Sequence, residues 1–183
     1  MEADILDKSK VKDLKVWGDI MSSKDNLKAA FTGESMANRT YLAFAKKADE
    51  EGYPQIAKLF RAAAAAETVH ALNHLQRMGG IGTTMDNLKE AINGEKYEFE
   101  SMYPQFIEEA KAEGDNRALW SFEVANKVER IHAGLFQKAL SEIGNNEEVD
   151  YYVCSICGHT HEGKPEANCP ICGAPASKFE KID

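Results

Sequence analysis

The pattern Glu-x-x-His occurs twice in the 183-residue chain, at Glu67 and His70 and again at Glu129 and His132. Positions i and i+3 of an α-helix share a face, so each copy directs one carboxylate and one imidazole the same way. Each copy also lies within an apolar stripe of helical spacing, where burial of unpaired ionisable groups is costly. A bound metal cation is the usual compensation, so the pattern predicts a metal site inside a helical domain.

The stripe that precedes each copy contains further carboxylates, namely Glu34 before the first and Glu95 and Glu98 before the second. Five carboxylates in one dry volume would repel one another and take up protons, whereas two divalent or trivalent cations balance them. Oxygen ligands with a minority of imidazoles suit iron or manganese better than zinc. One Glu from each of two helices plus Glu-x-x-His from two others is the pattern of di-iron carboxylate bundles. The predicted ligands are Glu34, Glu67, His70, Glu95, Glu98, Glu129 and His132.

Other polar residues lie close to these positions along the predicted helices. Tyr41 follows Glu34 by seven positions and Tyr103 follows Glu95 by eight. Spacing alone leaves two readings of the tyrosines open, either simple core packing or a phenol that donates to a ligand carboxylate. His74 has no Glu at the same spacing, so we expect it to be a core or supporting residue rather than a ligand.

Four long helices are needed to position these groups. Ser22 or Ser23 caps the first, which is predicted to run to about Gly52. The second begins at Pro54 and ends near Gly79.

The third helix is predicted to be capped by Thr84, and Pro104 is expected to kink it or mark a local irregularity. The fourth begins near Asp115 and stops before Gly144. Amphipathic helices of this length, each with one apolar stripe, predict an all-α four-helix bundle.

The composition changes after the bundle. We expect an N-terminal segment over residues 1–23, in which Leu14, Val16 and Trp17 suggest a short docked stretch. The expected domains are the bundle over 24–144, a polar linker over 145–150 and a small module over 151–183.

All four cysteines of the chain lie in this module, in two Cys-x-x-Cys-Gly motifs. Each motif forms a knuckle that directs two thiolates to one point, so two knuckles predict a tetrahedral four-sulfur site. A module of this size needs the metal to stay folded. Geometry alone leaves zinc and iron equally open. His159 and His161 are expected to be solvated rather than ligating. The predicted ligands are Cys154, Cys157, Cys169 and Cys172.

Bulk properties exclude some classes of function. A formal charge of −8 and a pI near 5.2 argue against a nucleic-acid partner, which requires a basic patch. No apolar run approaches the length that crosses a bilayer, and the start lacks the apolar core of a signal peptide. The sequence therefore predicts a soluble, cytoplasmic protein with no membrane partner.

The combination of motifs resembles the rubrerythrin family, from about residue 24 to the end. The matching stretches are 33–37, 59–62, Glu67 to His70, 94–98, 102–104, 129–132 and the two cysteine knuckles. The resemblance implies a ferritin-like di-iron bundle followed by a rubredoxin-like domain with one iron on four thiolates, which resolves the choice between zinc and iron. The stretch from Glu95 to Glu129 is one residue longer than that from Glu34 to Glu67, and we expect the extra residue in the loop around Gly114.

The resemblance also implies a role for each ligand. Glu67 and Glu129 would bridge the two irons. Glu34 would bind one iron, and Glu95 with His132 the other. Glu98 and His70 would exchange as ligands of the first iron when its oxidation state changes. Tyr41 and Tyr103 would hydrogen-bond to ligand carboxylates.

Family membership further implies an activity and its partners. The implied activity is a hydrogen peroxide reductase, a non-haem di-iron peroxidase that protects against oxidative stress. Electrons would come from an external donor, such as rubredoxin or an NAD(P)H-linked reductase, through the four-cysteine iron site. A homo-oligomer is expected, as a head-to-tail dimer or a tetramer, sometimes with exchanged helices.

Two alternatives remain open at this point. One is a ferritin-like ferroxidase that oxidises and stores iron, against which the cysteine module argues. The other is a structural bundle with a zinc ribbon as an interaction module.

Overall fold

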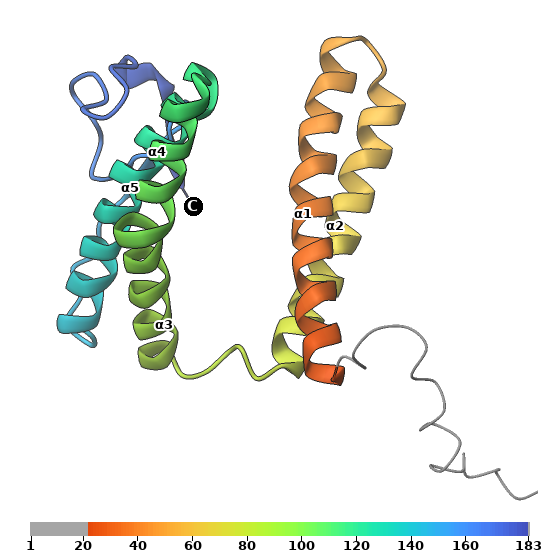
Figure 1. The fold of residues 1–183 in the computed structure, drawn as a ribbon, viewed down its shortest axis with the longest axis horizontal. Coiled ribbons are helices and arrows are strands. Elements are labelled where there is room, and N and C mark those ends of the chain that lie inside the picture. The colour runs from red at the N-terminus through yellow and green to blue at the C-terminus, as the bar shows by residue number, and fades with distance from the viewer. Residues whose placement is uncertain (1–21, 183) are drawn as a thin grey trace, which may run out of the picture. The chain divides into compact units, whose positions relative to one another are not determined.

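The structure is a computed structural model that describes residues 22–182. The expected docked stretch around Leu14, Val16 and Trp17 lies outside the described residues. The chain divides into two compact units, residues 1–81 and 82–183 (Figure 1), which are described separately below. Among residues 22–182, no helix is both long enough and apolar enough to cross a bilayer.

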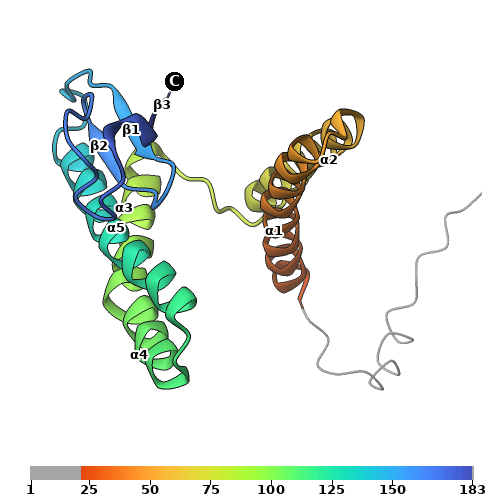
Figure 2. The same ribbon diagram turned by 90° about the horizontal axis from the view of Figure 1, so that it is seen from above.

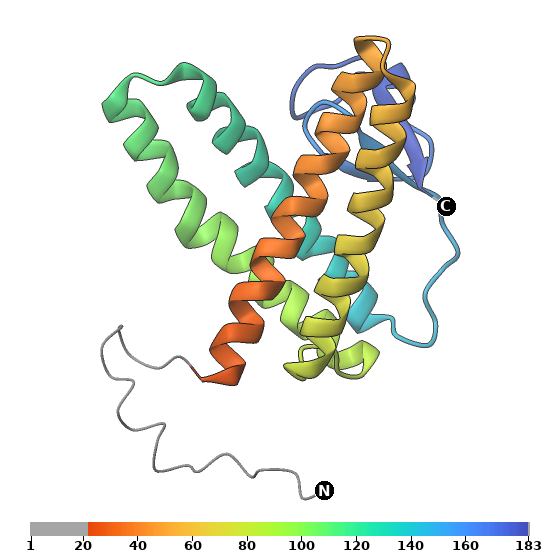
Figure 3. The same ribbon diagram turned by 90° about the vertical axis from the view of Figure 1, so that its right-hand side faces the viewer.

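The first unit is a hairpin of two long antiparallel helices, α1 (Ser23–Glu50) and α2 (Pro54–Arg77), seen side by side in Figure 3. Ser22 caps α1 as predicted: its side chain accepts a hydrogen bond from the Asp25 N–H, and the Asp25 carboxylate accepts from the Ser22 N–H. Gly52 turns the chain with φ +80°, a conformation that favours glycine. Pro54 then starts α2, where a missing N–H costs nothing.

Small residues allow the two helices of this hairpin to pack closely. The buried side chains of the hairpin are all alanines, namely Ala45, Ala48, Ala57, Ala64 and Ala71. The last three recur at every seventh position along α2. Asn38 of α1 joins the helices, because its Nδ2 donates to the Ala64 carbonyl at 2.6 Å. The larger apolar side chains of the hairpin, such as Met36, Phe44 and Leu59, are exposed. The hairpin therefore carries apolar surface that its own two helices do not cover.

The second unit begins with one continuous helical segment and its partner. The segment consists of α3 (Thr84–Tyr97), the π-helix η2 (Glu98–Met102) and α4 (Tyr103–Glu113), and it packs against α5 (Asn116–Ser141). The cap of α3 is Thr83, whose Oγ1 accepts from the Asp86 N–H. The prediction of Thr84 as the cap is therefore wrong by one residue. The fourth helix begins near Asp115 as predicted, because α5 starts at Asn116 with Asp115 as its cap.

The π-helix η2 explains the extra residue between Glu95 and Glu129. A π turn is a one-residue insertion into an α-helix. Tyr103 follows Glu95 by eight positions, whereas Tyr41 follows Glu34 by only seven. The insertion thus lies before Tyr103, within η2, and its expected place in the loop at Gly114 is wrong. The irregularity predicted from Pro104 is confirmed, since a proline in the first turn of α4 has no N–H to continue the regular ladder.

The core of this helical pair lies between α3, α4 and α5. Its buried side chains are Ile92, Ile107, Ala110, Val124, Val128 and Ala133. Next to it, the rings of Tyr103, Phe106 and Phe122 form a cluster with centroids 5.5 to 6.3 Å apart. Aromatic packing thus holds α4 against α5 just after η2.

A small three-stranded antiparallel sheet follows, made of β1 (Tyr151–Cys154), β2 (Thr160–Glu162) and β3 (Phe179–Ile182) in the order β2-β1-β3 (Figure 2). A short 3₁₀ turn, η3 (Ala176–Lys178), leads into β3. The predicted linker is attached to α5 by a hydrogen bond, because Nδ2 of Asn146 donates to the Ala139 carbonyl at 3.0 Å. The sheet belongs to the same compact unit as α3 to α5.

Candidate metal centres

The first candidate metal cluster lies in the hairpin of α1 and α2. Ligand atoms of Glu34, Glu67 and His70 lie within 4.8 Å of one another. Nδ1 of His70 is 2.9 Å from Oε2 of Glu67 and 4.0 Å from Oε1 of Glu34. The i, i+3 spacing on α2 and a single Glu from α1 bring the three together, as predicted for this half of the ligand set.

The second cluster repeats this geometry on α3 and α5. Ligand atoms of Glu95, Glu129 and His132 also lie within 4.8 Å of one another. Nδ1 of His132 is 2.8 Å from Oε2 of Glu129 and 3.7 Å from Oε1 of Glu95. In both clusters the histidine therefore turns the same ring nitrogen toward the two carboxylates.

Burial and unbalanced negative charge shape the second cluster. Burial, and then the charge of Glu129, raise the pKa of Glu95 to about 7. The hydrogen bond to Glu129 raises the pKa of His132, although burial acts against the imidazolium. These shifts report carboxylates that have no cation beside them apart from one imidazole, which is the environment that a metal ion would stabilise.

Glu98 and Tyr103 border the second cluster but are not part of it. Glu98 begins η2 and is not within the three-residue ligand group, yet burial and the charge of Glu129 raise its pKa. Burial and the charges of Glu129, Glu98 and Glu95 raise the pKa of Tyr103. The implied hydrogen bond from Tyr103 to a ligand stays a prediction.

Tyr41 and His74 follow ligands of the first cluster along α1 and α2. The ring of Tyr41 packs on Phe60, with centroids 6.2 Å apart. Its implied hydrogen bond to a ligand also stays a prediction. His74 is partly buried in the last turn of α2 and lies outside the ligand group. This position agrees with its predicted supporting role.

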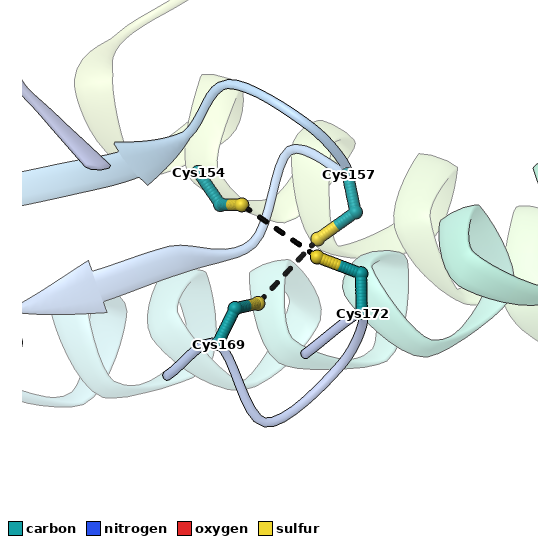
Figure 4. A group of neighbouring side chains, drawn as sticks. All are labelled: Cys154, Cys157, Cys169 and Cys172. Atoms are coloured by element: carbon teal, nitrogen blue, oxygen red, sulfur yellow. Dashed lines mark hydrogen bonds between the residues drawn. The ribbon is translucent and has the colours of Figure 1, made fainter. Parts of the chain in front are cut away.

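The four cysteines converge on one point from two loops (Figure 4). The Sγ atoms of Cys154 and Cys172 lie 3.8 Å apart, and those of Cys157 and Cys169 lie 3.6 Å apart. Four thiolates at about 2.3 Å from a central metal would be spaced by about 3.8 Å, so the geometry suits a tetrahedral site. The prediction that these four residues form one sulfur site agrees with this arrangement.

Each knuckle is closed by a backbone hydrogen bond and a glycine. The N–H of Gly158 donates to the Cys154 carbonyl at 2.8 Å, and that of Gly173 donates to the Cys169 carbonyl at 2.9 Å. Both glycines have positive φ, +80° and +76°, which side chains rarely adopt. The Cys-x-x-Cys-Gly motif thus shapes the site through its glycine as well as its thiols.

The thiols of the site differ in their ionisation. Burial opposes the thiolate of Cys154, but the amides of Ile156 and Cys157 outweigh it and lower its pKa. Burial raises the pKa of Cys157 and of Cys172. A metal cation bound by the four sulfurs would lower these pKa values, because it stabilises the thiolate form.

His159 departs from its expected place. It is only 6% exposed and packs on the ring of Phe179, with centroids 5.9 Å apart. The expectation that His159 is solvated is therefore wrong, because β1 pairs with β2 and β3 and the sheet folds its ring inward. His161 is partly exposed, and Nδ1 of its ring lies 3.0 Å from the Gly163 carbonyl.

Sequence reasoning missed the residues that join the cysteine module to α5. Nε2 of His132, the nitrogen that faces away from the carboxylates, lies 2.9 Å from Oγ1 of Thr160. Nζ of Lys138 lies 2.9 and 3.0 Å from the two carboxylate oxygens of Glu162. No local pattern marks these residues, since their partners are 24 and 28 positions away.

The residues present fit the metals that the motifs predict. Two groups of two carboxylates and one imidazole offer hard oxygen and nitrogen donors, which suit iron. The four sulfurs offer a tetrahedral thiolate site, which suits one iron or zinc. A bound cation would offset the effect of burial on the pKa of Glu95 and of Cys157, because it stabilises the ionised form of each ligand.

Comparison with known proteins identifies the class. The rubrerythrin family matches residues 25–140, and the rubrerythrin rubredoxin-like domain matches residues 152–180. Rubrerythrin-2 of Clostridium acetobutylicum is 37% identical over 173 residues, covering 85% of this chain and 94% of its own length. Nigerythrin of Nitratidesulfovibrio vulgaris is 40% identical over 172 residues, covering 86% of this chain and 85% of its own length.

Solved structures support the same relationship. The fully reduced, all-ferrous state of nigerythrin matches with a TM-score of 0.55 and 35% identity, covering 92% of this chain and 91% of that one. A partially reduced state of nigerythrin matches with the same TM-score, identity and coverage.

The chain belongs to the rubrerythrin family, whose members are di-iron oxidoreductases. The predicted fold class is confirmed, a helical ferritin-like domain followed by a small rubredoxin-like domain. The predicted cofactors are confirmed as well, a di-iron centre and one iron for the four cysteines.

Proposed function

We propose that this protein reduces hydrogen peroxide to water with electrons relayed through its four-cysteine iron site. The observation that carries the proposal is the repeated cluster of two carboxylates and Nδ1 of one histidine, next to a four-sulfur site in the same chain. A pair of irons supplies two electrons together, which avoids the release of a hydroxyl radical from one-electron reduction.

The proposed ligands are those of the sequence prediction. Glu67 and Glu129 would hold both metals, Glu34 the first iron, and Glu95 with His132 the second. Glu98 and His70 would exchange on the first iron. The contacts of the two rings differ within their own units. The His70 ring contacts Glu67 and Glu34 through Nδ1, whereas the His132 ring contacts Glu129 through Nδ1 and Thr160 through Nε2.

The overall reaction requires protons as well as electrons. One hydrogen peroxide, two protons and two electrons give two waters. The side chains of the second cluster form an environment in which protons are held tightly, because burial and the neighbouring carboxylate raise the pKa of Glu95 and of Glu98. Burial and the charges of the same carboxylates also raise the pKa of the Tyr103 phenol.

Electrons are proposed to enter at the cysteine module from an external donor, such as a rubredoxin or an NAD(P)H-linked reductase. Cys157 and Cys172 are partly exposed, whereas Cys154 and Cys169 are 1% and 2% exposed. Ile156, in the first knuckle, is 48% exposed and offers apolar surface next to Cys157. A donor would therefore approach the outer sulfurs, and a reducing compartment would keep the thiols available.

Self-association is part of the proposal. The exposed apolar side chains of α1 and α2 would be covered by helices of the same chain or of a second copy. A head-to-tail dimer, a tetramer and an exchange of helices all meet this need. Native mass measurement distinguishes these small oligomers from the large shell that an iron-storing ferritin would form.

Anaerobic stopped-flow spectroscopy tests the activity. The iron-loaded protein is reduced fully and mixed with one equivalent of hydrogen peroxide. Rapid oxidation of the di-iron centre, followed by the colour of the ferric thiolate site, supports a peroxidase. If neither site is oxidised by peroxide although oxygen oxidises added ferrous iron, the ferroxidase alternative is correct.

A further inference from the structure

The hydroxyl of Thr160 lies between the two metal-binding regions of the second unit. Its Oγ1 is 2.9 Å from Nε2 of His132 and 3.4 Å from the carbonyl oxygen of Gly158. A threonine hydroxyl has one proton to donate and lone pairs to accept with. The Gly158 carbonyl can only accept, so a Thr160 hydroxyl that donates to it can accept from Nε2 of His132 whenever that nitrogen carries the ring proton.

This polarity selects the state of His132 that a metal needs. Nδ1 of His132 faces Glu129 and Glu95, so it is the nitrogen that a metal in this cluster would bind. Nε2 must then carry the ring proton, and Thr160 is placed to accept it. An acceptor behind a ligating histidine fixes its tautomer and ring orientation.

The backbone around Thr160 leads directly to two of the cysteines. The N–H of Cys154 donates to the His159 carbonyl at 3.0 Å, and this carbonyl forms the peptide bond to Thr160. The Gly158 carbonyl that accepts from Thr160 is one residue after Cys157. Two short chains of covalent and hydrogen bonds thus run from the first knuckle and meet at Thr160.

Independent contacts hold this region against α5. Lys138 lies six positions after His132 on α5 and forms the two-point ion pair with Glu162, two positions after Thr160 on β2. Asn146 fastens the connecting segment to α5. The hydrogen bond between Thr160 and His132 is therefore one of three contacts of a docked surface.

We infer that Thr160 is a positioning residue that couples the four-cysteine site to His132 and carries the electron route between them. This inference rests on the proposed function. Each crossing would take one electron from a thiolate-bound iron to the site that His132 would help to hold, with no atom transferred. Two crossings, with the thiolate-bound iron re-reduced by the external donor between them, would balance the reduction of one peroxide.

The first test observes the hydrogen bond without iron in the helices. In protein loaded with diamagnetic zinc in both the cysteine site and the carboxylate clusters, nitrogen-15 NMR should show a slowly exchanging Nε2 proton of His132. We expect this signal in the parent protein and in Thr160→Ser, which keeps the hydroxyl, and its loss in Thr160→Val. An unchanged signal in Thr160→Val would overturn the inference.

The second test measures electron transfer in a single turnover. Fully reduced, iron-loaded protein is mixed with one equivalent of peroxide. In Thr160→Val we expect the ferric thiolate colour to appear roughly tenfold more slowly relative to oxidation of the di-iron centre, as for other supports of ligating histidines. Thr160→Ser should restore the rate. Ser155→Ala is the matched control, because it removes a hydroxyl that bonds within the module, to the Lys178 carbonyl at 2.9 Å.

The outcomes separate this inference from the proposed function. If peroxide oxidises no iron in the parent protein, the proposed function is wrong, and the NMR signal still decides whether Thr160 holds His132. If the di-iron centre is oxidised normally and the thiolate iron follows at the parent rate in Thr160→Val, Thr160 is not on the route.

Discussion

Lys138 of α5 and Glu162 of β2 form an ion pair in which one ammonium nitrogen contacts both carboxylate oxygens, at 2.9 and 3.0 Å. Both side chains are partly exposed, at 45% and 30%. Water screens such an exposed pair, so it contributes little to stability. Its value to the protein is positional, because it holds β2 beside the α5 turn that carries His132.

Replacing Lys138 should loosen this docking without unfolding either part. We expect Lys138→Met to change the free energy of unfolding little, because the ion pair is solvent-exposed, and to speed amide exchange in β2. The matched control is Lys181→Met, which removes an ion pair with Asp150 at 2.8 Å within the module. Equal exchange in both variants, measured by mass spectrometry, would show that the Lys138 pair does not hold the module on α5.

Substitution of His70 should separate metal binding from turnover. His70→Leu is expected to slow peroxide turnover by roughly tenfold with little loss of iron, because the proposed exchange uses His70 in one oxidation state only. His132→Leu should lose iron as well, since His132 is a ligand in both. His74→Leu is the control, because His74 lies one turn further along α2 and outside the cluster. Metal analysis beside steady-state rates checks this, and full activity in His70→Leu would refute ligand exchange.

Loss of one cysteine should remove the thiolate iron but leave the helices intact. Cys154 is 1% exposed and its sulfur is part of the four-sulfur group. Cys154→Ser therefore removes one of the four thiolate ligands at a position that is closed to solvent. We expect the visible colour of the module to disappear while the helical circular dichroism is retained, because the cores of α1 to α5 are separate from the module. Loss of helical signal together with the colour would contradict this separation.

The metal-free protein should become less stable as the pH rises toward neutrality. The pKa of Glu95 is raised from 4.5 to about 7, so the folded state holds this proton more tightly than the unfolded chain does. The contribution is complete below about pH 4.5 and is lost as the pH rises through about 7. His132 acts in the same direction, since its pKa is raised from 6.5.

Thermal melting of chelator-treated protein between about pH 5 and pH 8 measures this effect. Glu95→Gln should flatten the profile, because the amide does not titrate. Iron loading should flatten it as well, since the metal replaces the protons. A melting temperature that rises with pH in metal-free parent protein would mean that another group dominates.

The sequence by itself determined the local arrangement of the ligands. Glu67 with His70, and Glu129 with His132, share helix faces because the α-helix places i and i+3 together, and the structure groups each pair with the Glu expected from the preceding helix. The two knuckles likewise follow from Cys-x-x-Cys-Gly, because the glycine allows the turn that closes each loop. These features depend on short-range geometry, which residue type and spacing encode directly.

Tertiary structure decided what depends on contacts between distant segments. The number of residues between Glu95 and Glu129 does not say whether the extra residue lies in the loop or in the helix. Only the backbone places it in η2, which begins at Glu98. The burial of His159 and the bond from His132 to Thr160 depend on how the sheet folds and docks on α5. Such contacts join residues far apart in the chain, and their energy depends on packing and desolvation that no local pattern carries.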